Sequence, residues 1–206
     1  MPACQQAINY KEKLVTAKDC CKTYADIRFK KLDFKDPLSQ QVGDEESPAM
    51  SFPEGKSFFM AIEFPEFKIP FEINIESLPT YNQLFVPTLL LLDRQYRVVR
   101  RIEDSSFQYS NGKTSYKFFI NYEDKNIHYM VVYTRSGIIG KTNHSVTTQQ
   151  ATIPIFAGAY VINYTTHSEV KNKIKNARGG NLNVVAKEYK LRNISDDPNR
   201  DHSPDF

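Results

Sequence analysis

The 206-residue sequence has no tryptophan, only three cysteines, and no apolar run long enough to cross a membrane as a helix. A membrane-spanning helix needs about 20 apolar residues, whereas the leucine run at 89–92 is bounded by Pro87 and Asp93. The run is also too short for an ordinary globular helix. It therefore predicts a short β-strand that is buried on both faces and lies centrally in a covered sheet. Asp93-Arg94-Gln95 is then predicted as a turn, and Tyr96–Ile102 as the second strand of a β-hairpin.

The sequence also lacks the short motifs of several common enzyme classes. It has no Gly-x-Ser-x-Gly elbow and no glycine-rich phosphate loop, since Pro53–Ser57 only ends like one and has no first glycine. No two histidines are three or four residues apart, as the positions show: His128, His144, His167 and His202. We therefore expect no catalysis, no cofactor and no bound metal.

Charge of one sign is not in excess. The chain has 27 basic and 24 acidic residues, for a net charge of +3. Such a balanced mixture supports solubility and carries no nucleic-acid signature. The most basic stretch, Lys171–Arg178, is interpreted as the solvated face of a helix. We expect no nucleic-acid partner.

The cysteines leave two alternatives open. A disulfide from Cys4 to Cys20 or Cys21 would close a short loop and contribute about 3 kcal/mol in an oxidising compartment. The other alternative is three reduced, partly buried thiols. The first 20 residues show no signal peptide, which predicts a chain that is either cytosolic or already processed.

Four segments are expected along the chain. Residues 1–32 form an N-terminal helical segment, because apolar residues in 5–26 recur at intervals of three and four. Residues 33–54 are rich in proline and acidic residues and form a connecting arm. Residues 55–191 form a β-sandwich domain. Residues 192–206 contain two prolines and four aspartates and form a disordered tail.

The sandwich is predicted from period-two alternation. Segments such as "GKSFFMAIEF", "FEINIES" and "SYKFFINYED" alternate apolar and polar residues and are separated by turn signals. Seven or eight mostly antiparallel strands then form two facing sheets, a mainly β, jelly-roll-like sandwich. "IPIFAGAYVINY" is predicted as one strand. "THSEVKNKIKNARGG" is predicted as a short helix before the last strand, with Val170 and Ile174 at helical spacing.

Several stretches together resemble the MalM family, the maltose-operon periplasmic proteins of Gram-negative bacteria. They are "CCKTYADIRFKKL", "FPEGKSFFMAIEFPE", "INIES" and "FVPTLLLLDRQY". The resemblance covers about residues 14–190 and is strongest from Phe85 to Asp93. It implies an exported protein, soluble in the periplasm or associated with the outer membrane, with no established reaction. Longer members carry a Pro/Ala-rich linker and a helical C-terminal extension, and this sequence lacks both.

If the chain is exported, Cys4 after Ala3 is a candidate lipid-attachment residue and the only expected contact with a membrane, although Met1 and Pro2 match a lipobox poorly. Two functions follow from the resemblance and the residues. One is a non-catalytic binding protein for an oligosaccharide such as maltodextrin. Its sugars would stack on loop aromatics that otherwise cap the core: Tyr81, Phe85, Phe107 and Tyr109. The other is a structural subunit, with envelope proteins as partners, in an outer-membrane-associated assembly such as a secretion-system core complex.

Overall fold

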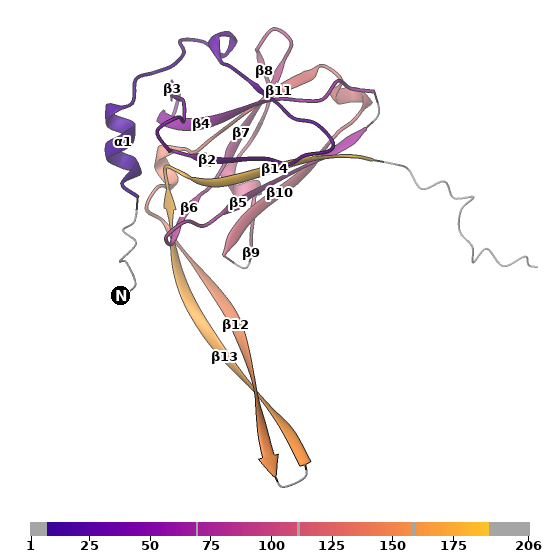
Figure 1. Ribbon diagram of the computed structural model, residues 1–206. Coiled ribbons are helices and arrows are strands. Elements are labelled where there is room, and N and C mark those ends of the chain that lie inside the picture. The colour runs from indigo at the N-terminus through magenta and orange to yellow at the C-terminus, as the bar shows by residue number, and fades with distance from the viewer. Residues whose placement is uncertain (1–7, 69, 111, 158–159, 190–206) are drawn as a thin grey trace, which may run out of the picture.

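The computed structural model describes residues 8–68, 70–110, 112–157 and 160–189. Most strands lie in two sheets (Figure 1). The first has the order β1-β4-β11-β7-β8, with β3 paired to β4. Its strands are β1 (Lys30–Lys31), β3 (Ala49–Phe52), β4 (Gly55–Glu63), β7 (Thr88–Asp93), β8 (Val98–Ile102) and β11 (Ile127–Tyr133).

The second sheet has the order β2-β14-β5-β10-β9 and is antiparallel throughout. Its strands are β2 (Leu38–Val42), β5 (Phe71–Leu78), β9 (Gln108–Ser110), β10 (Lys113–Ile120) and β14 (Gly180–Glu188). A third, three-stranded sheet joins β6 (Gln83–Phe85), β12 (Thr142–Ala157) and β13 (Tyr160–Ala177). One α-helix, α1 (Tyr10–Thr16), and four 3-10 turns complete the described part: η1 (Tyr24–Asp26), η2 (Asp104–Ser106), η3 (Tyr122–Asp124) and η4 (Ser136–Ile138).

The main core lies between the first two sheets. Residues from β4, β7 and β11 pack there against residues from β5, β10 and β14. This arrangement confirms the mainly β, antiparallel sandwich. The alternation in β5 shows how the sequence specifies it, because Phe71, Ile73 and Ile75 are buried while the residues between them are only half-buried.

Strand β7 is buried on both faces, as its leucine run predicted. Leu89 and Leu91 belong to the main core. Leu90 and Leu92 belong to a second apolar cluster on the other side of the sheet, which the N-terminal segment covers with residues such as Ile27. The predicted β7–β8 hairpin is also confirmed, with Leu89 opposite Ile102.

The helix predicted over "THSEVKNKIKNARGG" is wrong, because that segment lies in β13. Val170 and Ile174 are four residues apart, and an even spacing also fits one face of a strand. The single strand predicted for "IPIFAGAYVINY" is wrong as well, since β12 ends at Ala157 and β13 begins at Tyr160. Residues 153–157 lie in β12 and residues 160–164 lie in β13, and the two strands pair as one hairpin.

Two N-terminal expectations are corrected in detail. The helix is shorter than the 5–26 periodicity suggested, since α1 spans seven residues. The connecting arm at 33–54 is not structureless, because it contributes β2 to one sheet and β3 to the other. Cys4 and the predicted disordered tail lie outside the described residues. Within the described ranges, no helix combines the length and apolar character required to span a membrane.

The β12–β13 hairpin leaves the body of the sandwich (Figure 1). Its strands pair over sixteen positions, from Thr142 opposite Lys175 to Ala157 opposite Tyr160. At about 3.3 Å per residue, a strand of this length reaches roughly 50 Å. β6 pairs only with the base of the hairpin, at Lys175–Ala177.

Candidate functional site

The four aromatics predicted to stack on sugars do not lie together. Phe85 is fully buried and belongs to the main core. Tyr81 is exposed in the turn before β6, where its backbone has a positive φ of 49°. Phe107 and Tyr109 do meet, because both line one cavity beside the base of the hairpin. Two of the four predicted residues therefore share one cavity.

This cavity has a volume of about 220 Å³. It lies where η2, β9 and β10 approach the ends of β12 and β13 that join the body. Its lining is Val86, Asp104, Phe107, Tyr109, Thr114, Ile138, Lys141, Asn143 and Asn176. The lining combines two aromatic rings with hydroxyl, amide and charged groups.

Two hydroxyl groups of the lining, on Tyr109 and Thr114, are buried and have no hydrogen-bond partner among the described residues. The amides are better satisfied. Asn143 Nδ2 donates to Asn176 Oδ1 at 2.6 Å, and Asn176 Nδ2 donates to the carbonyl oxygen of Ile138 at 3.2 Å. Buried polar groups normally have a protein or water partner. Both hydroxyl oxygens have almost no accessible surface, so they lie behind the wall of the cavity and do not face an occupant.

An ion-pair network begins at the edge of the cavity. Asp104 pairs with Arg135, and Arg135 Nη1 also lies 3.1 Å from Glu103 Oε2. Arg101 connects Glu103, at 2.7 Å from its Nε, to Glu54. Each carboxylate thus has a basic partner, which is typical of a structural network.

Tyr133 completes this network from the core. Its hydroxyl donates to Glu54 Oε2 at 3.0 Å. Burial, and after it the hydrogen bond to Glu54, raise the pKa of Tyr133. Burial alone would raise the pKa of Glu54, but hydrogen bonds from Arg101 and Tyr133 outweigh it and lower that pKa. Glu54 is therefore held ionised and is unsuited to act as a general acid.

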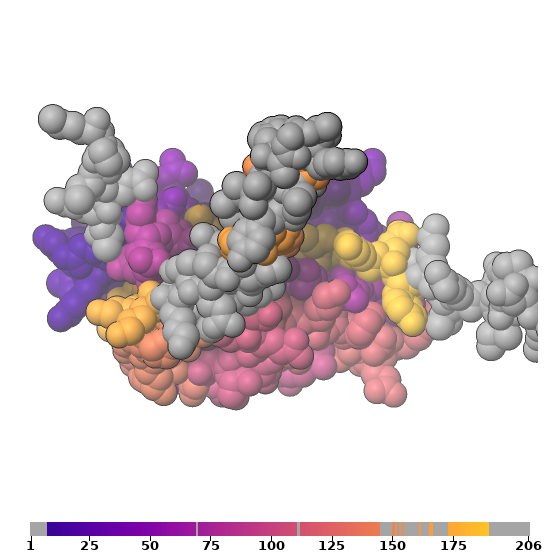
Figure 2. Space-filling model, turned by 90° about the horizontal axis from the view of Figure 1, so that it is seen from below, coloured from indigo at the N-terminus to yellow at the C-terminus, as the bar shows by residue number. Residues whose placement is uncertain are grey.

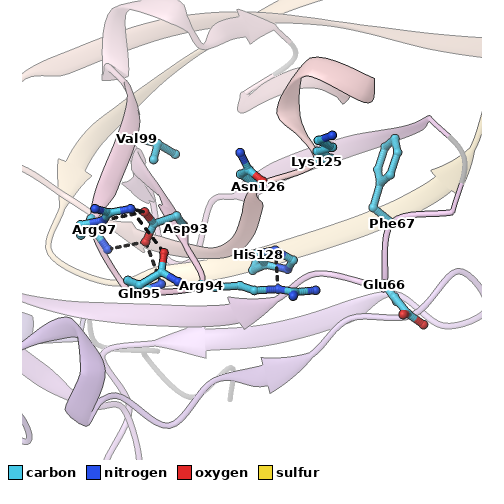
Figure 3. A pocket seen from close by; sticks show the side chains of 10 residues that line it. All are labelled: Glu66, Phe67, Asp93, Arg94, Gln95, Arg97, Val99, Lys125, Asn126 and His128. Carbon is cyan, nitrogen blue, oxygen red and sulfur yellow. Dashed lines mark hydrogen bonds and ion pairs between the residues drawn. The ribbon is translucent and has the colours of Figure 1, made fainter.

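A larger groove, of about 610 Å³, lies at the β7–β8 turn (Figure 3). Its lining is Glu66, Phe67, Asp93, Arg94, Gln95, Arg97, Val99, Lys125, Asn126 and His128. Arg94 Nε donates to His128 Nε2 at 3.0 Å, which requires a neutral imidazole. Burial and the neighbouring Arg94 both lower the pKa of His128.

The acids of this groove are also engaged or exposed. Asp93 accepts hydrogen bonds from Gln95 N and from Arg97, so its carboxylate closes the turn. Glu66 is exposed and points away from the other side chains (Figure 3). No acid–base pair converges here. In the described part of the chain, no group of three His, Cys, Asp or Glu residues is arranged to hold a metal.

The structure corrects both alternatives for the cysteines, because Cys20 and Cys21, which are adjacent in sequence, are joined to each other by a disulfide. Cys21 packs at the margin of the second apolar cluster.

Residues 54–152 match the family model described as "Maltose operon periplasmic protein precursor (MalM)". This part of the chain is a MalM family domain. The comparisons with curated proteins and with solved structures gave no match. The description of the family as periplasmic supports a periplasmic location for the chain. The resemblance found on the sequence is thereby confirmed within the matched residues.

The MalM match begins next to β4 and ends inside β12. It includes the leucine strand β7 and the Phe107–Tyr109 side of the cavity. The distal part of the hairpin, β13 and β14 lie outside it, although β14 pairs with β5 in the middle of the second sheet. The sandwich therefore needs residues beyond the matched segment.

The hairpin was missed by the sequence reasoning, although the sequence carries two signals for it. Gly158 interrupts an apolar run and is a turn signal. Residues 142–168 contain no Asp, Glu, Lys or Arg, whereas charged residues make up 25% of the chain. When seen from below, the described residues of the distal half, in orange, lie in front of the body (Figure 2).

The register of the hairpin sorts its residues into two sets. Directly opposed residues share a face, and the face alternates along the strand. The set that begins with Thr142 and Lys175 contains every charged residue and both histidines: His144, His167, Glu169, Lys171, Lys173 and Lys175. The set that begins with Asn143 and Ile174 contains none, and its distal members are mostly apolar: Ala151, Ile153, Ile155, Ala157, Tyr160, Ile162, Tyr164 and Thr166. The charges of the hairpin therefore lie in one set and toward the base, and both sets are uncharged toward the tip.

Proposed function

We propose that the chain is a non-catalytic periplasmic binding protein that acts as a structural subunit, with the β12–β13 hairpin as its contact element. One observation carries the proposal. Sixteen residue pairs extend from the body, and β6 contacts them only at the base. An isolated two-stranded hairpin is marginally stable in water at best. A partner that covers the hairpin would supply the stabilisation that the body does not.

The side chains of the body support a role in binding other proteins. The acids near both cavities are paired with basic groups or exposed, and the rigid core on either side of β7 suits a carrier for the hairpin. In this proposal the partners are other envelope proteins, in an outer-membrane-associated assembly of the secretion-system type. Acylation of Cys4 would be its membrane contact.

The test uses a trimmed variant that removes only the outer hairpin. His144 lies directly opposite Lys173, so residues 145–172 can be replaced by Asn-Gly, which favours a two-residue hairpin turn. We expect the full chain to sediment from gently solubilised envelopes as a large complex and the trimmed variant to sediment as a monomer. Equal sedimentation of the two forms would contradict the proposal, provided that circular dichroism shows both to be folded.

A second function, oligosaccharide binding, is favoured by the cavity at Phe107 and Tyr109. Its polar side chains Lys141 and Asn143 suit the hydroxyl groups of a sugar, and its aromatic rings offer apolar faces for stacking. The volume of about 220 Å³ is below the roughly 300–1,000 Å³ of drug-sized pockets. The occupant would therefore be one sugar unit or the end of a maltodextrin.

Thermal unfolding tests this second function. A ligand that binds only the folded form raises the melting temperature with concentration. Millimolar maltose or maltodextrin should raise it for the wild type and much less for Tyr109→Ala, which lacks the stacking ring. Tyr122→Ala is the control, because Tyr122 is exposed and lies outside the cavity. The function is rejected if the wild type shows no shift, or if Tyr109→Ala shifts as much as the wild type.

A further inference from the structure

We infer that the partner of the hairpin is the hairpin of a second copy of this chain, with β12 of one copy paired to β13 of the next. This inference rests on the proposed function, in which the hairpin is the contact element. The argument concerns backbone edges, charge and register.

Both outer edges of the hairpin are available for strand pairing. In the described residues, β12 pairs with β13 alone, and β13 has a second neighbour only at Lys175–Ala177, where β6 lies. Edge strands are usually protected by charges, proline or short length. β12 has sixteen residues, no Asp, Glu, Lys or Arg, and one proline, Pro154. Its edge is long and weakly protected, which favours strand addition.

The charges disfavour one of the possible contacts. All four charged residues of the hairpin are in the basal half of β13: Glu169, Lys171, Lys173 and Lys175. A parallel ladder of β13 with β13 of another copy would bring lysines close to lysines, and like charges on neighbouring strands are destabilising. Pairing β13 with β12 places each lysine beside an uncharged strand. The distribution of charge therefore disfavours a parallel β13–β13 contact and permits a contact between β13 and β12.

The apolar positions decide the direction. Two copies of the same strand, β12 or β13, that pair antiparallel over their full length would make the two hairpins point in opposite directions. That arrangement would place the apolar distal end of each strand beside the polar base of the other copy. A parallel β12–β12 ladder is slightly less stable per residue than an antiparallel ladder. When β12 pairs with β13 of a copy that points the same way, the strands are again antiparallel, and the apolar distal ends lie together. Burial of apolar surface favours this second arrangement.

The resulting contact is heterologous, because each copy offers β12 and receives a neighbour on β13. Such head-to-tail contacts repeat until they close into a ring, or they continue as a filament. The base of β13 is already occupied by β6. The new ladder would therefore extend outward from Ile174, and the bodies would gather at one end of the shared sheet.

Crosslinking between differently substituted copies tests this pairing. Thr152 and Thr165 are exposed, lie opposite each other in one hairpin, and have hydroxyl oxygens 3.3 Å apart. One purified population carries Thr152→Cys and the other carries Thr165→Cys, both with the three native cysteines replaced by serine. A short bis-maleimide tolerates an offset in register between copies.

We expect crosslinks mainly between unlike populations, and little product when either population is treated alone. Light scattering should give the full chain a mass that is a multiple of 23.8 kDa, and the trimmed variant the mass of one chain. A full chain that stays monomeric, or crosslinks that form chiefly between two Thr152→Cys copies, would overturn the inference. If the chain alone is monomeric but its envelope complex still depends on the hairpin, the partner is another protein and the proposed function stands.

Discussion

At the scale of single residues, Asp93 shows how a turn is fixed by one carboxylate. It ends β7 and is nearly buried. Its Oδ1 accepts from Gln95 N at 2.8 Å and from Arg97 N at 3.0 Å, and its Oδ2 accepts from Arg97 Nε at 2.8 Å. Burial alone would raise the pKa of Asp93, but these hydrogen bonds outweigh it and hold the pKa below its usual range.

We predict that Asp93→Asn lowers the melting temperature at pH 7 by a few degrees, because Arg97 loses its anionic partner. A carboxyl whose pKa is lowered by folding stabilises the protein above its unfolded pKa, about 3.9, and this contribution disappears as the pH falls through the folded pKa. The difference between variant and wild type should therefore be full at pH 7 and shrink below about pH 4. Thermal unfolding across this range measures it.

Glu66→Gln is the matched control for the groove. The Glu66 side chain is 80% exposed, and its nearest basic group, Lys68 Nζ, is at the long distance of 4.0 Å. It should leave the melting temperature unchanged at every pH, because exposed ion pairs contribute little. A penalty for Asp93→Asn that stays constant down to pH 3 would show that the charge of Asp93 is not what stabilises the turn.

Residue-scale prediction from the sequence succeeded where local chemistry decides the outcome. Asp93-Arg94-Gln95 was predicted as a turn, and the structure shows why it forms: the Asp93 side chain accepts hydrogen bonds from the backbone amides of Gln95 and Arg97. Burial of single aromatics was not predictable in the same way. Phe85 and Phe107 are both aromatic residues near strand ends, but one is in the core and one lines a cavity. Which occurs depends on strands that are distant in sequence, such as β13 beside β6.

At the scale of elements, β7 and β13 explain why one strand was predicted and the other was missed. The leucine run is short, apolar at every position and bounded by Pro87 and Asp93, so a doubly buried strand was the remaining solution. In β13 the apolar residues Val170 and Ile174 are four apart, which fits a helix face and a strand face equally. Pairing with β12 decides between them, and a single sequence does not show that pairing.

We predict that Leu90→Ala and Leu91→Ala each lower the free energy of unfolding by about 2–5 kcal/mol, since each leaves a cavity among buried side chains. The two leucines belong to different apolar clusters. Equal effects would show that the N-terminal segment is a true second layer over β7. Chemical denaturation measures both changes.

Val99→Ala on the neighbouring strand is the control, because Val99 is 49% exposed and its truncation should change stability by less than about 0.5 kcal/mol. If Leu91→Ala is costly but Leu90→Ala behaves like this control, the outer face of β7 is not packed as the structure shows.

At the scale of the whole molecule, we expect the stability of the sandwich to be largely independent of the hairpin. Neither apolar cluster contains a described residue of β12, and the hairpin reaches the body through Ile174 and its neighbours at the base. The sequence predicted the sandwich because its alternation is local. The sequence did not predict the hairpin, because the distal half of the hairpin has no surface of the body to pack against. In our proposal, other molecules supply the contacts that stabilise it.

We therefore predict that the variant with residues 145–172 replaced by Asn-Gly melts within about 4 °C of the full chain, when both are monomeric at high dilution. For a chain of this size, 1 kcal/mol corresponds to roughly 2–4 °C, so the expected change is about 1 kcal/mol or less. By contrast, Ile174→Ala in the full chain should cost about 2–5 kcal/mol, because Ile174 is only 4% exposed. Calorimetry compares the three forms, and a trimmed variant less stable than Ile174→Ala would mean that the hairpin is part of the folding unit and not an appendage held for a partner.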